Sequence, residues 1–160
     1  MSEVNWQKCS TFEEPQQSPG FQLWQTFLTW QRELNLVLQP LGLTQPQFSI
    51  LAVVGWLTRD RASVSEAMPN RTIALSDRAI TFLTENRTAI KQQDIADFMK
   101  MERMHVSQVV RKLEKMGYVE RSSSVEDGRV QLIQLTRSGV SKLEEALPLV
   151  EAADAKFFSP

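Results

Sequence analysis

The sequence predicts a mostly helical α+β fold that contains a winged helix-turn-helix. Two observations carry this prediction. Apolar residues recur at three- and four-residue steps over most of the chain, which indicates amphipathic helices. In segment 89–137, two short helical patterns joined by a tight turn are followed at once by two strand-like runs around Asp127-Gly128. With 160 residues, the chain fits one domain, 1–160.

Composition excludes several classes of protein. The chain has 18 Lys and Arg, 19 Asp and Glu, one cysteine and one histidine. One cysteine cannot form an internal disulfide, and Cys9 with His105 cannot complete a four-ligand zinc site. We therefore expect neither a metal nor another cofactor. The N-terminus lacks a basic and apolar leader, and no apolar run is long enough to span a bilayer, so we expect a cytoplasmic protein with no membrane partner.

The N-terminal half predicts two helices, followed by a long polar segment. The stripe of apolar residues over 20–39 predicts the first helix, which Pro40 ends. Thr44 is the expected N-cap of a second helix that reaches residue 57. Residues 58–88 are rich in charged residues, Ser and Ala and predict a polar connection, in which Ser76 is the expected cap of a short helix.

The C-terminal half predicts the winged helix-turn-helix over 89–137 and a last helix over 138–160. Ile95, Phe98 and Met99 mark the first short helix. The next helix spans 102–115, with Gly117 as its stop, and strands over 118–123 and 129–136 form a hairpin. In the helix over 102–115, the residues expected to point inward are Val106, Val110 and Leu113. Ser138 is the expected cap of the last helix, which Pro148 is expected to kink or divide.

The outward face of the helix over 102–115 carries side chains of the types that contact DNA. In a winged helix-turn-helix this helix lies in the major groove. Arg pairs with guanine, Gln with adenine and Ser with either, while Arg and Lys also bind phosphate. We expect contacts from Arg103, His105, Ser107, Gln108, Arg111 and Lys112. For His105, a plain polar surface position is the alternative.

The hairpin tip adds a second candidate contact. Arg129 follows the turn, and the carboxylate of Asp127 is expected to bind its guanidinium and aim it at a narrow minor groove. The segment 89–137 holds nine Lys and Arg against seven Asp and Glu, a net charge of +2. The chain as a whole has a net charge of −1, so the positive charge is local.

The segment from Ile90 to Gly139 resembles the DNA-binding core of the multiple-antibiotic-resistance regulator (MarR) family. The run DIADFMKMERMHVSQVVRKLEKMGYVER, the triplet Asp127-Gly128-Arg129, then Leu135-Thr136 and Gly139 carry the likeness. The resemblance implies a homodimer on duplex DNA with a pseudo-palindromic operator, and a repressor relieved by a small ligand. It implies that the helices within 20–57 and 138–160 form the dimerisation and core region. It also implies that Arg129 is the minor-groove residue of the wing. The long segment 58–88 is an unusual insertion for this family.

Several alternatives remain beside this interpretation. Winged helices also serve as protein-docking modules without DNA. Trp24, Trp30 and Trp56 either line a pocket for a small aromatic or anionic effector or belong to the core and the dimer interface. Cys9 in a polar tail is expected to be inert. The sequence has no phosphate-binding glycine loop, nucleophile elbow or metal motif, so we expect that the protein is not an enzyme.

Overall fold

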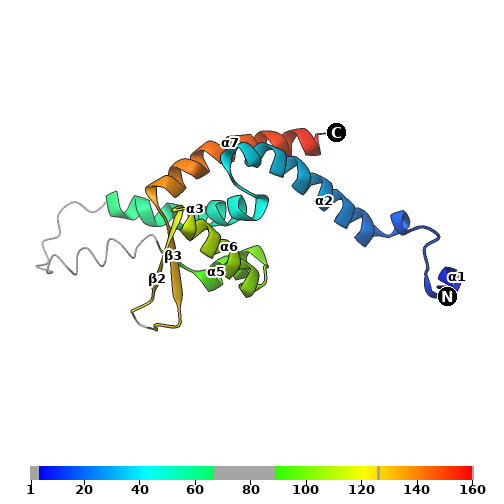
Figure 1. The fold of residues 1–160 in the computed structure, drawn as a ribbon, viewed down its shortest axis with the longest axis horizontal. Helices are drawn as coiled ribbons and strands as arrows, with labels where there is room; N and C mark the ends of the chain where they lie inside the picture. Colours follow the sequence, from blue (N-terminus) through cyan, green and yellow to red (C-terminus); the bar gives the residue numbers. More distant parts are fainter. Residues whose placement is uncertain (1–3, 67–88, 126, 160) are drawn as a thin grey trace, which may run out of the picture.

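The computed structural model describes residues 4–66, 89–125 and 127–159 (Figure 1). Helices dominate, and three short strands form one antiparallel sheet, so the predicted fold class is confirmed. The elements in chain order are α1 (Trp6–Cys9), η1 (Pro15–Gln17), α2 (Pro19–Leu38), η2 (Gln39–Leu41), α3 (Gln45–Glu66), β1 (Ile90–Lys91), α5 (Gln92–Met99), α6 (Arg103–Lys115), β2 (Val119–Ser123), β3 (Gln131–Leu135) and α7 (Arg137–Phe158).

The first two predicted helices are present, and the second is longer than expected. Helix α2 begins after Ser18, whose hydroxyl accepts the N–H of Phe21, and α3 begins directly after Thr44. We expected a polar connection from residue 58, but α3 continues to Glu66. Residues 58–66 contain neither Gly nor Pro, so polarity alone does not end the helix. The rest of the expected connection, with the short helix capped by Ser76, lies outside the described residues.

The winged helix-turn-helix follows the prediction closely and contains one additional strand. Helix α6 ends as expected at Gly117, which has φ +75°. Strand β3 lies in the middle of the sheet, with β2 on one side and β1 on the other. Ile90 of β1 faces Ile133, and Arg121 of β2 faces the same residue from the other side. Strand β1 was missed because two residues are too short to show an alternating pattern.

Helix α7 corrects two expectations from the sequence. Its N-cap is Thr136 rather than Ser138, since the Thr136 hydroxyl accepts the N–H of Gly139 at 2.9 Å. The same hydroxyl donates to the carbonyl of Gly117, which ties the start of α7 to the start of β2. Pro148 does not divide the helix, which is unbroken over its length. A proline removes only one backbone donor, and the buried Ala146 and Val150 on either side hold the helix by packing.

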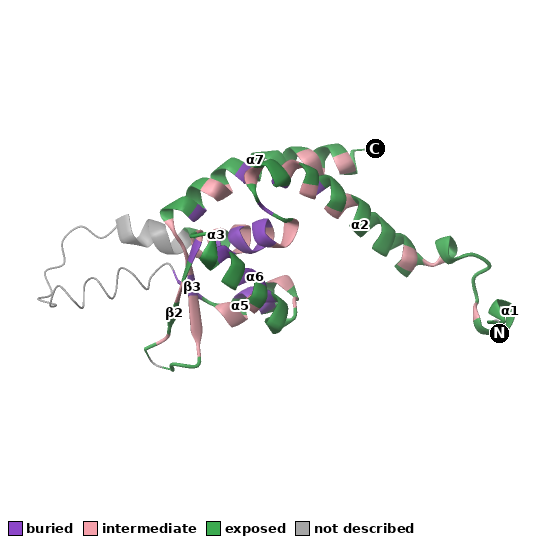
Figure 2. Ribbon diagram, viewed as in Figure 1, coloured by how far each residue is buried: buried purple, intermediate pink, exposed green. Residues whose placement is uncertain are grey.

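The buried core lies where α3, α6, α7 and the sheet meet. Figure 2 shows buried residues in these elements, whereas most of α2 and most of the N-terminal segment are exposed. The N-terminal segment with α1 lies at the far end of α2, away from the winged helix (Figure 1). The fully buried side chains are Leu34, Leu38, Ile50, Leu51, Val54, Ile95, Val106, Val110, Leu113, Val119 and Ile133.

Candidate nucleic-acid interface

The outward face of α6 is the centre of the candidate site. The opposite face is buried through Val106, Val109, Val110 and Leu113, which includes all three residues predicted to point inward. Because an α-helix has 3.6 residues per turn, positions directly opposite that face follow steps of four, three and four residues. We call the four residues on this outward face the outward stripe: Met104, Gln108, Arg111 and Lys115. All four are exposed.

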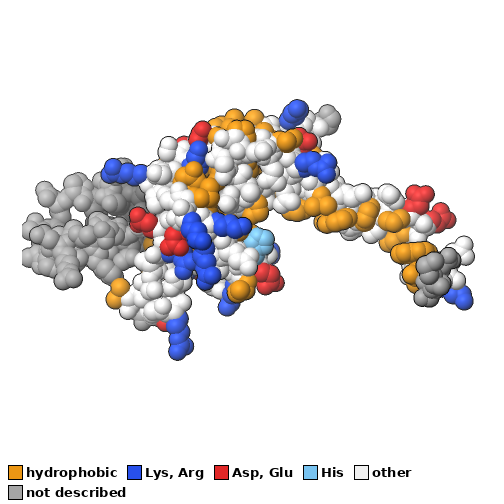
Figure 3. All heavy atoms as spheres, in the orientation of Figure 1, with side chains coloured by type: hydrophobic (Ala, Val, Ile, Leu, Met, Phe, Trp, Pro, Cys, Tyr) orange, Lys and Arg blue, Asp and Glu red, His pale blue; other side chains and the backbone are white. Residues whose placement is uncertain are grey.

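The other sequence-predicted residues of α6 lie beside the outward stripe. Helical geometry puts Arg103 and Ser107 on one side and His105 and Lys112 on the other. Of these four, only Ser107 is half-buried. Figure 3 shows basic side chains gathered around α6, beside the single histidine of the chain. Sequence analysis missed Met104 and Lys115, although their spacing of four residues from Gln108 and Arg111 was a signal for both.

The turn before α6 fixes the angle at which the outward stripe is presented. Lys100 adopts a left-handed conformation with φ 53°, and the N–H of Met101 returns to the carbonyl of Ala96 at 3.0 Å. These features end α5 within one turn. Ile95 and Ala96 are buried in the common core with α6. The tight turn expected between the two helices is therefore present.

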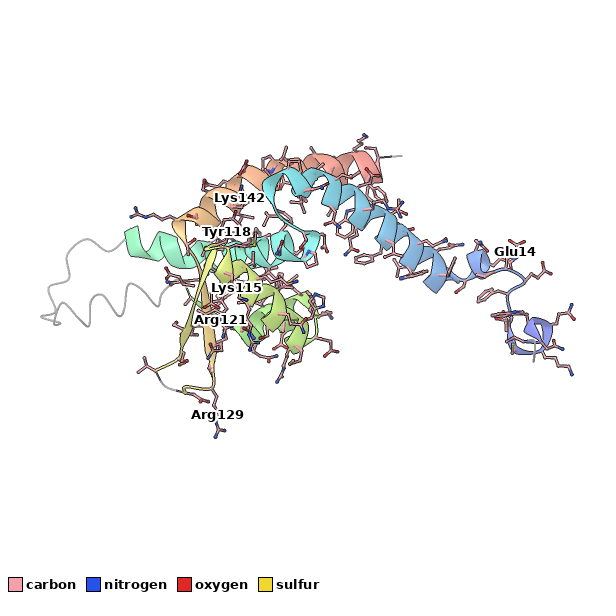
Figure 4. All side chains as sticks on the ribbon, in the orientation of Figure 1. Glu14, Lys115, Tyr118, Arg121, Arg129 and Lys142 are labelled. Carbon is pink, nitrogen blue, oxygen red and sulfur yellow. The ribbon has the colours of Figure 1, made fainter. Side chains whose placement is uncertain are left out.

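The wing places Arg129 at the tip of the β2–β3 hairpin. Its side chain extends away from the sheet (Figure 4). We expected the Asp127 carboxylate to bind the Arg129 guanidinium, but Asp127 Oδ1 accepts the backbone N–H of Arg129 at 3.0 Å. The carbonyl of Asp127 also accepts the N–H of Val130 at 2.9 Å. Asp127 thus shapes the turn that carries the arginine and leaves the guanidinium pointing outward.

A basic cleft joins the wing to the two helices. Its volume is about 370 Å³. Lys91, Arg103 and Arg129 line it, and none of the described residues that line it is acidic. Three cations around one hollow attract an anion such as a DNA phosphate. Sequence analysis identified Arg103 and Arg129 but missed Lys91, because only the pairing of β1 with β3 brings it to this edge. The residues that line the basic cleft are Lys91, Gln92, Gln93, Arg103, Arg129, Val130 and Gln131.

At the C-terminal end of α6, one arginine is held within the protein. Arg121 lies 3.7 Å from the carboxylate of Glu114 and donates to Gln131 Oε1 at 3.2 Å. Glu114 therefore faces a cation of the sheet rather than the outward stripe. Its negative charge is partly compensated before any ligand approaches.

A separate apolar cavity of about 950 Å³ lies between α3 and α7 and reaches α5. Its charged lining groups are Arg59, Glu144 and Glu151. The Arg59 guanidinium lies 3.5 Å from the ring centroid of Trp56 and donates to the Trp56 carbonyl at 2.7 Å. The apolar side chains that line the cavity are Ala52, Val53, Trp56, Phe98, Leu135, Val140, Leu143 and Leu147.

The three tryptophans predicted for an effector pocket do not come together in one chain. Trp56 lines the apolar cavity, whereas Trp24 and Trp30 are not among its lining residues. Trp30 donates its indole N–H to Asp154 at 2.7 Å and joins α2 to α7. Trp24 lies on the exposed part of α2, against Phe21. The alternative interpretation, core or interface, fits Trp30.

Other groups offer no additional chemistry within the part of the chain that the structure describes. Among residues 4–66, 89–125 and 127–159, no three His, Cys, Asp or Glu side chains gather as metal ligands. Cys9 is exposed in α1, and its thiol lies 3.2 Å from the carbonyl of Asn5. Over the same residues, no helix is both long and apolar enough to cross a membrane.

Comparison with known proteins identifies the family. The MarR family model matches residues 82–130. The uncharacterized HTH-type transcriptional regulator YdcH of Bacillus subtilis (strain 168) is 33% identical over 150 residues, covering 94% of this chain and 84% of that protein. The chain belongs to the MarR family. The resemblance found in the sequence is confirmed, and relatives that are transcriptional regulators agree with the expectation that this MarR-family protein is not an enzyme.

Solved structures show the same fold as this MarR-family chain. A mutant MarR from E. coli, complexed with operator DNA, is 17% identical with a TM-score of 0.65, covering 97% of this chain and 85% of that one. Bordetella bronchiseptica BpsR, studied for regulation of its DNA binding by 6-hydroxynicotinic acid, is 18% identical with a TM-score of 0.65. That match covers 90% of this chain and 81% of BpsR. At these identities, the likeness concerns the arrangement of helices and strands.

Proposed function

We propose that this MarR-family protein binds a pseudo-palindromic operator in duplex DNA as a homodimer and represses transcription until a small ligand releases it. The observation that carries the proposal is the exposed outward stripe of α6, together with a basic cleft that is lined by Arg103 of α6 and by the wing arginine Arg129. A helix in the major groove contacts base edges, while flanking cations contact phosphates. The similar fold of E. coli MarR, solved with operator DNA, supports this docking. We also propose the cytoplasm as its location, because the operator is there.

The homodimer is supported by exposed apolar side chains on α2 and α7. Figure 3 shows hydrophobic side chains along both helices. Leu23 is 72% exposed and Trp24 is 55% exposed, and Val140 and Leu149 of α7 are also exposed. Large apolar side chains exposed on two long helices are typical of an interface. Pairing two copies there presents two α6 helices, whose half-sites are expected to lie about 34–36 Å apart.

The apolar cavity supports control by a small ligand. Phe98 of α5 and Leu147 of α7 both line it, so a ligand there contacts the winged helix and the dimerisation region together. Among the described residues that line the cavity are two carboxylates and one guanidinium, and the guanidinium already stacks on Trp56. These charges favour a neutral or cationic aromatic ligand over an anionic one. Regulation of BpsR by 6-hydroxynicotinic acid supports a ligand-controlled function for this fold.

Selection of duplex DNA from a random pool at two salt concentrations tests the proposal, with the mass in solution measured alongside. We expect an inverted repeat, bound by a dimer whose affinity falls as salt rises. The double variant Gln108→Ala, Arg111→Ala removes two residues of the outward stripe and is expected to lose the enrichment. Lys156→Ala is the matched control, since it removes an exposed cation near the end of α7 and is expected to enrich the same sequence.

The docking-module alternative predicts a different result in the same selection. A folded protein that enriches no sequence, or that binds all duplexes equally with both variants unchanged, contradicts sequence-specific DNA binding. Circular dichroism of each variant shows whether the helices remain, so loss of folding is recognised separately.

A further inference from the structure

Met104 is the single apolar residue of the outward stripe. It is 73% exposed, although the neighbouring stripe position is Gln108 and its chain neighbours are Arg103 and His105. Such exposure means that packing within the described part of the chain does not account for an apolar side chain here. Leu23 and Trp24 of α2 are also strongly exposed and belong to the proposed dimer surface, whereas Met104 lies on the proposed DNA-contacting face of α6.

The position of Met104 determines what it can contact. It lies in the first turn of α6, and the N-terminal residues of a recognition helix are those that contact base edges. In the major groove the thymine 5-methyl group is the apolar feature of the base-pair edges. The methionine side chain is flexible and polarizable, so it adapts to a small apolar group. We propose that Met104 reads a thymine methyl in each half-site and thereby sets sequence specificity, an inference that rests on the proposed function.

The next residue of the outward stripe sharpens this proposal. Gln108 is one helical turn from Met104, and an amide side chain pairs with the N6 and N7 edge of adenine. Four residues of helix rise about 6 Å, and successive bases are about 3.4 Å apart along a strand. Met104 and Gln108 therefore contact base pairs one or two steps apart. Each half-site is expected to contain a thymine and an adenine at that separation, on the same strand or on opposite strands.

Replacing thymine by deoxyuridine tests the contact, because the change removes only the 5-methyl group. The selected operator is prepared with one thymine of a half-site replaced at a time, together with its symmetry mate, and affinities are measured for each duplex. For the wild-type dimer we expect about a fourfold loss for each buried methyl group removed, and so about a sixteenfold loss when both half-sites are substituted, at one position of the half-site. Substitution at the remaining thymines is expected to change affinity less than twofold.

Two variants assign the effect to Met104. Met104→Ala is expected to bind the thymine and deoxyuridine duplexes equally at that position, whereas Met104→Leu keeps an apolar side chain and is expected to keep the preference. Lys112→Ala serves as the control, because loss of a cation weakens binding to every duplex and leaves the methyl preference intact. Because Met104 and Lys112 are both exposed, all three variants are expected to fold.

The outcomes separate this inference from the function on which it rests. A wild-type protein that selects an operator but shows no methyl dependence overturns the role of Met104, as does Met104→Ala with the preference unchanged. A selected half-site without thymine overturns it too. A folded wild-type protein that selects no operator contradicts the proposed function itself.

Discussion

The winged helix and helix α2 differ in how much of their apolar surface a single chain buries. Helix α6 buries four of its 13 residues against α3, α5 and the sheet. Helix α2 buries only Leu34 and Leu38 of its 20 residues, and both lie near its C-terminal end. A helix gains most of its stability from packing an apolar face, and the exposed half of α2 leaves such a face uncovered. The winged helix therefore buries its apolar face within one chain, whereas the proposed dimerisation region does not.

The two regions are joined at the start of α7. The Thr136 hydroxyl binds the Gly117 carbonyl at 2.6 Å, and the Thr136 N–H donates to the Tyr118 carbonyl at 3.1 Å. Gly139 lies against the backbone of Tyr118, where a Cβ atom would collide with the carbonyl oxygen. This contact fixes the direction in which α7 leaves the winged helix. Any change of α7 is thus transmitted to β2 and to the adjoining end of α6.

The largest effect is expected for Gly139→Ala, which breaks this junction. The added methyl group meets the Tyr118 backbone rather than the end of a flexible side chain, so the helix or the strand must shift. We expect the free energy of unfolding to fall by at least about 3 kcal/mol. Gly128→Ala is the control, because its Cβ meets no atom within 4 Å, and its effect is expected within about 0.5 kcal/mol. Urea unfolding of both variants measures the difference; equal stabilities contradict a tight junction.

The second-largest effect is expected for the proposed dimer surface on α2. Leu23→Glu puts a charge on the exposed apolar face of α2 and is expected to weaken dimerisation by at least about 2 kcal/mol. Gln25→Glu adds the same charge at an exposed polar position of the same helix and is expected to leave the dimer intact. Sedimentation equilibrium measures both association constants. If Leu23→Glu dimerises as tightly as the wild type, this face of α2 is not the interface.

The elements with regular apolar patterns could be predicted from the sequence, while features made by tertiary contacts could not. Val106, Val110 and Leu113 share one helical face, and their inward orientation is visible in the spacing alone. Strand β1 exists because Ile90 pairs with Ile133, forty-three positions away in the chain. The N-cap at Thr136 likewise depends on its bond to Gly117 rather than on the local preference that favoured Ser138.

The candidate site shows the same limit. Residue types on α6 indicated a DNA-contacting face, but Met104 was left out because an apolar side chain is not among the polar types used to find that face. Only its spacing of four residues from Gln108 pointed to it. The Asp127 contact was expected at the guanidinium and lies at the backbone N–H, since turn geometry decides which donor the carboxylate meets. The tryptophan prediction grouped residues by type, whereas the fold separates them between α2 and α3.

On the outward stripe of α6, Gln108→Ala distinguishes base contacts from phosphate contacts. We expect it to relax specificity at one position of each half-site, at a cost of about 1–3 kcal/mol for the preferred base. Arg111→Ala is expected to behave in the same way at a neighbouring position. Lys112→Ala, at the side of the outward stripe, is expected to weaken all sequences alike. Affinities for a set of single-base operator variants measure the pattern. Equal losses on all sequences for Gln108→Ala reassign it to the phosphate backbone.

The smallest effect is expected for the wing. Arg129→Ala removes a guanidinium that extends from the hairpin tip, and we expect affinity to fall by about 1 kcal/mol for most operators, with a salt slope smaller by about one. Arg129→Lys keeps the charge but loses the planar group that fits a narrow minor groove. It is therefore expected to restore the salt slope without restoring full affinity. Unchanged affinity for Arg129→Ala contradicts a DNA contact by the wing, and full recovery in Arg129→Lys shows that charge alone accounts for it.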